Sequence, residues 1–103
     1  MTASADGFKL YAVVNFKTCG WCKKFRPVWE QNTKAMNPRS QQRVELVQLD
    51  TPAGKAKAEE LGFSGGIPTL LATKNGAEVY RQPGYQDGKK FANTLFTLFS
   101  TYA

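Results

Sequence analysis

The sequence predicts an α/β fold in which a mixed four-stranded sheet is flanked by three helices, in the order β-α-β-α-β-β-α. Short apolar segments alternate with longer segments whose apolar residues recur at helical spacing, an alternation that favours parallel strands joined by helices. The Asn75-Gly76 pair between the last two strand-like segments is a strong signal for an antiparallel hairpin. With 103 residues, the chain is expected to form a single domain over residues 1–103.

The first strand and helix follow directly from the pattern. Residues 8–16 are apolar with a β-branched centre, which predicts a buried strand. Thr18 is placed to cap a helix over residues 19–36, in which Pro27 is expected to cause a bend. Asn37-Pro38 is expected to end that helix. Its predicted buried face consists of Cys22, Phe25, Trp29 and Met36.

The remaining elements are recognised in the same way. Residues 44–49 predict a second central strand, and residues 53–61, rich in Ala, Lys and Glu, predict a helix that Gly62 ends. Residues 69–73 and 78–81 predict the two strands of the hairpin. A C-terminal helix follows. Its predicted apolar face consists of Phe91, Leu95, Phe96, Leu98, Phe99 and Tyr102.

The composition makes a structural role for the two cysteines unnecessary. Hydrophobic residues make up 42% of the chain, with seven Phe and two Trp, which is enough for a core without a disulfide framework or a metal. The net charge of +6 favours either steering toward acidic partners or simple solubility. The basic residues are spread along the chain, so we expect no nucleic-acid partner.

The expected cellular location rests on the absence of a membrane span and of a secretion signal in the sequence. No segment approaches the apolar length of a membrane span, and residues 1–7 lack the basic start and apolar run of a secretion signal. We therefore expect a cytoplasmic protein with no membrane partner. In a compartment that keeps thiols reduced, a close cysteine pair favours redox chemistry or metal binding over a structural disulfide.

Cys19 and Cys22 form a Cys-x-x-Cys pair where a strand is followed by a helix. This placement predicts that Cys19 lies at the helix tip and faces solvent, while Cys22 lies one turn along and faces the core. The unpaired N–H groups and the positive end of the helix dipole would stabilise a thiolate at Cys19. Such a thiolate attacks a substrate disulfide, and Cys22 then resolves the mixed disulfide, leaving Cys19–Cys22 oxidised.

The pair has two other interpretations. A structural zinc site normally takes four Cys or His ligands, whereas this chain has two Cys and no His, so we expect no metal. A reduced pair that serves only packing is the second alternative, and the strand-to-helix context disfavours it. The redox-active cofactor is then the Cys19–Cys22 disulfide itself, and no other cofactor is expected.

At this point the sequence resembles thioredoxins over nearly the whole chain after about Phe8. Residues 13–16 (Val-Val-Asn-Phe), residues 19–23 (Cys-Gly-Trp-Cys-Lys) and Pro27 resemble the family's first central strand and active-site helix. Residues 66–70 (Gly-Ile-Pro-Thr-Leu) resemble its cis-proline loop almost letter for letter. The combination of the cysteine motif with this loop is far more specific than either motif alone.

The resemblance implies the other site residues. It implies a cis peptide bond between Ile67 and Pro68, and backbone pairing of Ile67 with a substrate chain in the manner of an added strand. It also implies a shallow apolar surface around Cys19. The substrate-binding residues assigned in this way are Gly20, Trp21, Ile67, Pro68, Thr69 and Gly84.

Asn15 marks a departure from the family pattern. Thioredoxins usually carry at this position a buried Asp that is thought to take the proton from the second cysteine. Asn15 cannot accept that proton, so Cys22 would be activated more slowly or by another group. The turn before Cys19 is also shorter than in thioredoxins, and the early start of the first strand is more like glutaredoxins.

The sequence therefore leaves four functions open. The favoured one is reduction of protein disulfides by a monomer that a reductase or glutathione re-reduces. The alternatives are a glutaredoxin-like, glutathione-dependent oxidoreductase and a non-catalytic docking module of the same fold. An oxidase or isomerase of an oxidising compartment is the fourth.

Overall fold

The sheet is built around strand β1 (Phe8–Val14), whose side chains are almost all buried. The computed structural model describes residues 7–103, so the expectation for residues 1–6 lies outside the described part. Strand β1 pairs in parallel with β2 (Val44–Gln48) and antiparallel with β3 (Thr69–Lys74), and β3 pairs antiparallel with β4 (Ala77–Pro83). The strand order is β2-β1-β3-β4, which confirms the predicted mixed four-stranded sheet.

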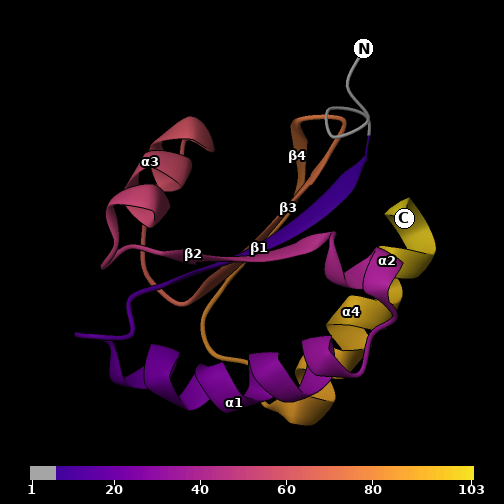
Figure 1. The fold of residues 1–103 in the computed structure, drawn as a ribbon, viewed down its shortest axis with the longest axis horizontal. Helices are drawn as coiled ribbons and strands as arrows, with labels where there is room; N and C mark the ends of the chain where they lie inside the picture. Colours follow the sequence, from indigo (N-terminus) through magenta and orange to yellow (C-terminus); the bar gives the residue numbers. More distant parts are fainter. Residues whose placement is uncertain (1–6) are drawn as a thin grey trace.

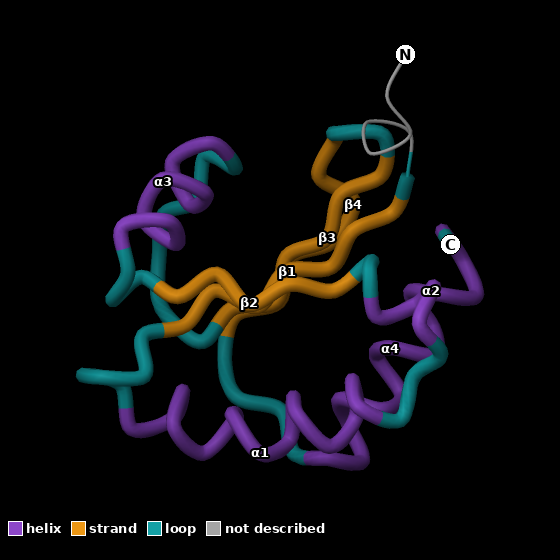
Figure 2. The backbone as a smooth tube through the Cα atoms, in the orientation of Figure 1, coloured by secondary structure: helices purple, strands orange, loops and turns teal. Residues whose placement is uncertain are grey.

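Helices cover both faces of this sheet. Helices α1 (Gly20–Lys34) and α4 (Gly88–Tyr102) lie on one face, and α3 (Pro52–Glu60) lies on the other (Figures 1 and 2). A fourth, one-turn helix, α2 (Pro38–Gln41), was not predicted. Helix α1 ends at Lys34, before the Asn37-Pro38 pair that was expected to end it, and this pair begins α2, because Asn37 Oδ1 accepts the Ser40 N–H at 2.8 Å.

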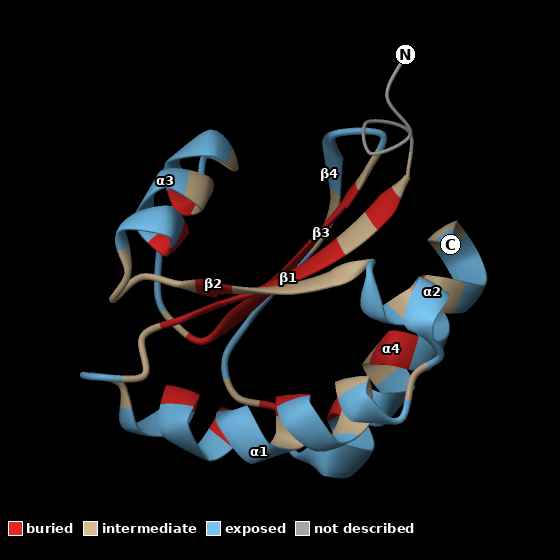
Figure 3. Cartoon of the chain, viewed as in Figure 1, coloured by how far each residue is buried: buried red, intermediate tan, exposed pale blue. Residues whose placement is uncertain are grey.

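The buried residues line the two inner faces (Figure 3). The larger cluster fills the space between the sheet and helices α1 and α4, where the rings of Phe25, Trp29 and Phe91 contact one another. The smaller cluster lies between the sheet and α3, and includes Tyr11 and Val13. Alternate residues of β1 thus point into different clusters, as the period of a strand requires.

Two sequence predictions about burial were wrong. Strand β2 is an edge strand rather than a second central strand, and among its residues Val47 alone is fully buried. Phe96 was placed on the apolar face of the last helix, but 75% of its surface is exposed. The side chains of that helix which enter the core are Phe91, Leu95 and Leu98.

The predicted hairpin is confirmed at Asn75-Gly76. Both residues have positive φ, 54° and 84°, as a two-residue turn of this kind requires. Gly62 also has positive φ and follows α3 as predicted. Among the described residues, none of the helices has the length and apolarity needed to cross a membrane.

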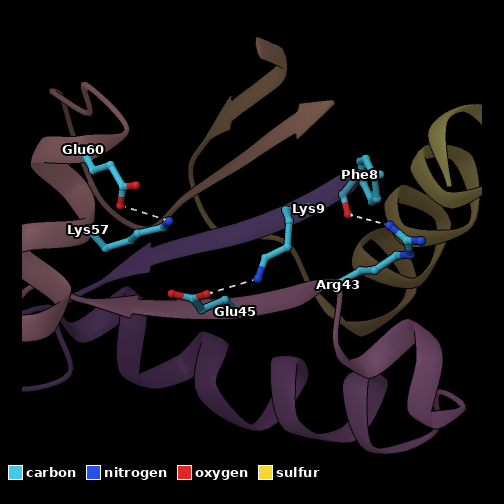
Figure 4. Close-up of polar contacts among 6 residues, drawn as sticks. All are labelled: Phe8, Lys9, Arg43, Glu45, Lys57 and Glu60. Carbon is cyan, nitrogen blue, oxygen red and sulfur yellow. Dashed lines mark hydrogen bonds and ion pairs between the residues drawn. The ribbon is translucent and has the colours of Figure 1, made fainter. Parts of the chain in front are cut away.

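Two ion pairs and a hydrogen bond to a backbone carbonyl lie toward the end of β1 that is away from the cysteines (Figure 4). Lys9 Nζ lies 3.4 Å from Glu45 Oε1 and joins β1 to β2, while Arg43 Nη1 donates to the Phe8 carbonyl at 3.2 Å. On α3, Lys57 Nζ pairs with Glu60 at 3.1 Å. Partly exposed pairs of this kind contribute little to stability each, about 0–1 kcal/mol.

Candidate active site

The turn that joins β1 to α1 is held by Asn15. Its side-chain Oδ1 accepts the backbone N–H of Lys17 at 3.0 Å and that of Thr18 at 3.2 Å. The Asn15 carbonyl accepts the Cys19 N–H at 3.1 Å. Asn15 therefore shapes the turn that presents Cys19, a role that its side-chain amide fills without any proton transfer.

Cys19 itself caps α1, so the prediction that Thr18 is the cap was wrong. Cys19 has an extended backbone (φ −107°, ψ 111°), and its Sγ accepts the Cys22 N–H at 3.1 Å. The same sulfur lies 3.8 Å from the Ile67 carbonyl oxygen, to which the thiol can donate. The Cys19 sulfur is thus half-buried and faces a backbone N–H at the N-terminus of α1.

Cys22 lies one helical turn along and has no exposed surface. Burial, together with the hydrogen bond and the negative charge of Cys19, raises the pKa of Cys22 to about 12. The backbone N–H of Asn15, 3.5 Å from the Cys22 sulfur, acts in the opposite direction. The two sulfurs therefore differ in access, because the Cys19 sulfur is half-buried and the Cys22 sulfur has no exposed surface.

This difference predicts selective alkylation. At pH 8 a thiol with a pKa of about 12 is ionised to only about one part in 10⁴. We expect iodoacetamide to modify Cys19 of the folded, reduced chain and to leave Cys22 unmodified, as read by mass spectrometry of proteolytic peptides. In urea both should react, and equal modification in the folded chain would contradict the burial of Cys22.

The hydrogen bonds of Asn15 in the turn between β1 and α1 lead to a prediction about stability. Asn15→Ala removes the acceptor for two backbone N–H groups and should lower the free energy of unfolding by about 1 kcal/mol. Asn15→Asp keeps an acceptor oxygen and should retain most of that stability. Urea unfolding of the two reduced variants measures both, and equal loss in Asn15→Asp and Asn15→Ala would show that the side-chain oxygen does not hold the turn.

A second loop faces the cysteines. The Ile67–Pro68 peptide bond is cis, as the resemblance implied. Pro68 and Thr69 are buried, the Thr69 hydroxyl donates to the Gly66 carbonyl at 2.6 Å, and the Gly84 N–H donates to the Pro68 carbonyl at 2.8 Å. The side chain of Thr69 thus holds the loop in place.

Trp21 and Tyr85 form an aromatic wall beside the thiols. Their ring centroids lie 5.3 Å apart, and Tyr85 also meets Phe25 edge-on at 6.4 Å. Trp21 is 56% exposed, a large apolar surface left open to solvent. Sequence analysis missed Tyr85, because a single aromatic residue in a glycine-bounded loop has no pattern that marks it as part of a site.

The structure brings most of the predicted site residues to one place. Hydrogen bonds link Cys19 to Cys22 and Ile67, and link Gly84 to Pro68, while Gly20 is exposed in the first turn of α1. Over residues 7–103, the structure contains no group of three or more His, Cys, Asp or Glu residues arranged to hold a metal ion. The arrangement is that of a reduced thiol pair with one accessible sulfur.

Comparison with known proteins agrees with this geometry. The sequence model of the Thioredoxin family matches residues 9–97, which is most of the chain. The chain belongs to the thioredoxin family. It is 38% identical over 69 residues to a thioredoxin of Chlamydia muridarum, covering 67% of this chain and 62% of that protein. It is 40% identical over 68 residues to the putative thioredoxin 2 of Streptomyces coelicolor, covering 64% of this chain and 45% of that protein.

These matches span less than two thirds of either relative's length. Solved structures of the family share the fold of this thioredoxin-family chain. A mutant thioredoxin from Halobacterium salinarum superimposes with a TM-score of 0.65 at 22% identity, over 92% of this chain and 77% of that one. The Malassezia sympodialis thioredoxin superimposes equally well, with a TM-score of 0.65 at 23% identity, over 91% and 78%.

Proposed function

We propose that this chain is a thiol–disulfide oxidoreductase that reduces protein disulfides through Cys19 and Cys22. One observation carries the proposal: the half-buried Cys19 sulfur accepts a backbone N–H at the tip of α1, next to a buried second thiol. Membership of the thioredoxin family supports this class of chemistry.

The reaction would proceed in two exchanges. The Cys19 thiolate attacks one sulfur of the substrate disulfide, a Cys19–substrate bond forms, and the other substrate sulfur leaves as a thiolate that takes a proton from solvent. Cys22 then loses its proton and attacks the Cys19 sulfur, which releases the second substrate thiolate. Two electrons pass from the cysteine pair to the substrate, and a disulfide joins Cys19 to Cys22.

The raised pKa of Cys22 suits this order of events. Burial is the largest cause of the increase, and part of the rest comes from the hydrogen bond and the charge of Cys19. These two contributions from Cys19 disappear once it is bonded to substrate, because the mixed disulfide carries no charge. Cys22 is thus kept protonated before the first exchange and becomes easier to ionise after it, although Asn15 supplies no carboxylate to take the proton.

Further partners follow from the same proposal. The Cys19–Cys22 disulfide is the redox centre, so no added cofactor is needed, and a reductase or glutathione returns it to the dithiol. Both sulfurs and the cis-proline loop come from one chain, which supports action as a monomer. A reductase of this kind works from its dithiol form, which reducing compartments maintain, so we propose a cytoplasmic location.

Turbidimetric insulin reduction with dithiothreitol tests the proposal. We expect the wild-type chain to accelerate insulin precipitation over dithiothreitol alone, and the Cys19→Ser/Cys22→Ser double variant to give no acceleration. Circular dichroism of the double variant checks that it is folded. Equal acceleration by a folded double variant would assign the effect to a docking surface instead, and no acceleration by wild type would refute protein-disulfide reduction.

A further inference from the structure

Three lysines lie close to the thiol pair along the chain, and none of them forms an ion pair with an acidic residue in the described part of the chain, residues 7–103. Lys17 lies in the turn before Cys19, and Lys23 and Lys24 lie in the first turns of α1; all three are exposed. The ion pairs among residues 7–103 involve the basic residues Lys9, Arg26, Lys57 and Arg81, and none includes these three lysines. The segments that form the site, residues 15–24, 63–69 and 82–86, contain no Asp or Glu.

Two of the lysines contact site residues through their backbone N–H groups, and the third does so through its side chain. The Lys17 backbone N–H is held by Asn15 Oδ1, and the Lys23 N–H donates to the Cys19 carbonyl at 3.1 Å. The Lys24 ammonium lies 4.7 Å from the Trp21 ring centroid, so the aromatic wall beside Cys19 carries a positive charge. Arg26 differs from them, because Glu30 pairs with it at 3.3 Å.

We propose that the Cys19–Cys22 pair acts preferentially on disulfides whose cysteines are flanked by acidic residues in an extended polypeptide. This inference rests on the proposed function and names its substrate class. Positive charges around an accessible nucleophile raise the rate of encounter with an acidic partner. The same charges repel a basic partner, so they discriminate between substrates as well as attract.

The spacing of the lysines indicates where the acidic residues should lie. Lys23 and Lys24 are four and five residues along the helix from Cys19, which corresponds to about 6–8 Å along its axis. In an extended substrate chain, residues two positions apart are separated by about 6.6 Å. For a substrate chain that runs alongside the first turns of α1, Glu or Asp two residues from the attacked cysteine would come level with this pair of lysines.

The test compares three synthetic peptides with the same cyclic disulfide, in which the residues two positions outside the cysteines are Glu, Gln or Lys. The chain is reduced beforehand, freed of reductant and mixed with each peptide at low salt. Acid-quenched samples are separated by chromatography to obtain second-order rate constants. We expect the Glu peptide to be reduced about tenfold faster than the Gln peptide, and the Lys peptide to be the slowest.

A matched pair of variants locates the effect. Lys17→Gln/Lys23→Gln/Lys24→Gln should bring the Glu-to-Gln rate ratio close to one. Lys34→Gln/Arg39→Gln/Lys55→Gln removes the same net charge from exposed positions in α1, α2 and α3, and should keep the ratio. Added salt should reduce the ratio in the wild-type chain, because the screening length is about 8 Å at physiological ionic strength.

Other results would overturn the inference. If wild type reduces all three peptides at one rate, the proposed function stands and the preference for acidic substrates fails. If it reduces none of them, the proposed function fails as well. Glutathione disulfide, which brings carboxylates without an extended chain, should react no faster than the Gln peptide. A faster reaction would assign the lysines to a small acidic disulfide.

Discussion

Gly54→Ala is expected to destabilise the fold by about 3 kcal/mol or more. Gly54 lies in α3 where this helix crosses the end of β2, and a Cβ there would overlap the carbonyl carbon and oxygen of Gln48. Backbone atoms cannot rotate away as a side chain can, so α3 would have to move off the sheet. The loss would take up a large share of the roughly 5–15 kcal/mol that stabilises a chain of this size.

The substitution Gly88→Ala provides the control. Gly88 begins α4, and a Cβ built there meets no atom within 4 Å. Gly88→Ala should therefore leave the free energy of unfolding unchanged or raise it by up to about 1 kcal/mol, because alanine favours the helix. Urea unfolding of both variants measures the difference, and a Gly54→Ala chain as stable as wild type would contradict the close approach of α3 to β2.

The second large effect is an asymmetry between the two cysteines. Cys22→Ser keeps the accessible nucleophile and should still form a mixed disulfide with substrate, but it cannot release the product. Cys19→Ser leaves only a buried thiol with a pKa raised well above its usual value by that burial, so its reaction with a disulfide should be slower by about a thousandfold or more. Turnover requires both sulfurs, but only the Cys19 sulfur should attack the substrate disulfide.

Local patterns predicted most of the fold. The cysteine pair and the Asn75-Gly76 turn depend on neighbouring residues, whereas the cis-proline loop was implied by the resemblance to thioredoxins, and the structure shows all three where they were expected. The edge position of β2 depends instead on where β3 inserts, on the far side of β1. Hydrophobic periodicity reports how deeply a strand is buried, and it carries little information about the order of strands in a sheet.

Two smaller errors in the sequence-based predictions also have local structural causes. Phe96 follows Leu95 directly, and one residue corresponds to about 100° around a helix, which carries its ring out of the stripe formed by Phe91, Leu95 and Leu98. Thr18 has the side chain typical of a cap, but the sulfur of Cys19 takes the Cys22 N–H instead.

At the site, the cysteines and the cis-proline loop could be predicted, whereas the role of the Asn15 side chain could not. Its amide oxygen accepts two N–H groups from a turn whose path no sequence pattern indicates. Tyr85 was missed for a related reason, since its contact with Trp21 joins segments far apart in the sequence.

Trapping of the mixed disulfide tests the division of labour between Cys19 and Cys22 most directly. Reduced Cys22→Ser and Cys19→Ser chains are mixed at pH 8 with a peptide disulfide, and the reaction is quenched with acid. The intact masses of the chains are then measured by mass spectrometry under non-reducing conditions. The proposed mechanism predicts a rapid, lasting peptide adduct on the Cys22→Ser chain. The folded Cys19→Ser chain should form none until urea exposes Cys22. Adducts forming at similar rates on both folded chains would contradict Cys19 as the attacking sulfur and Cys22 as the resolving one.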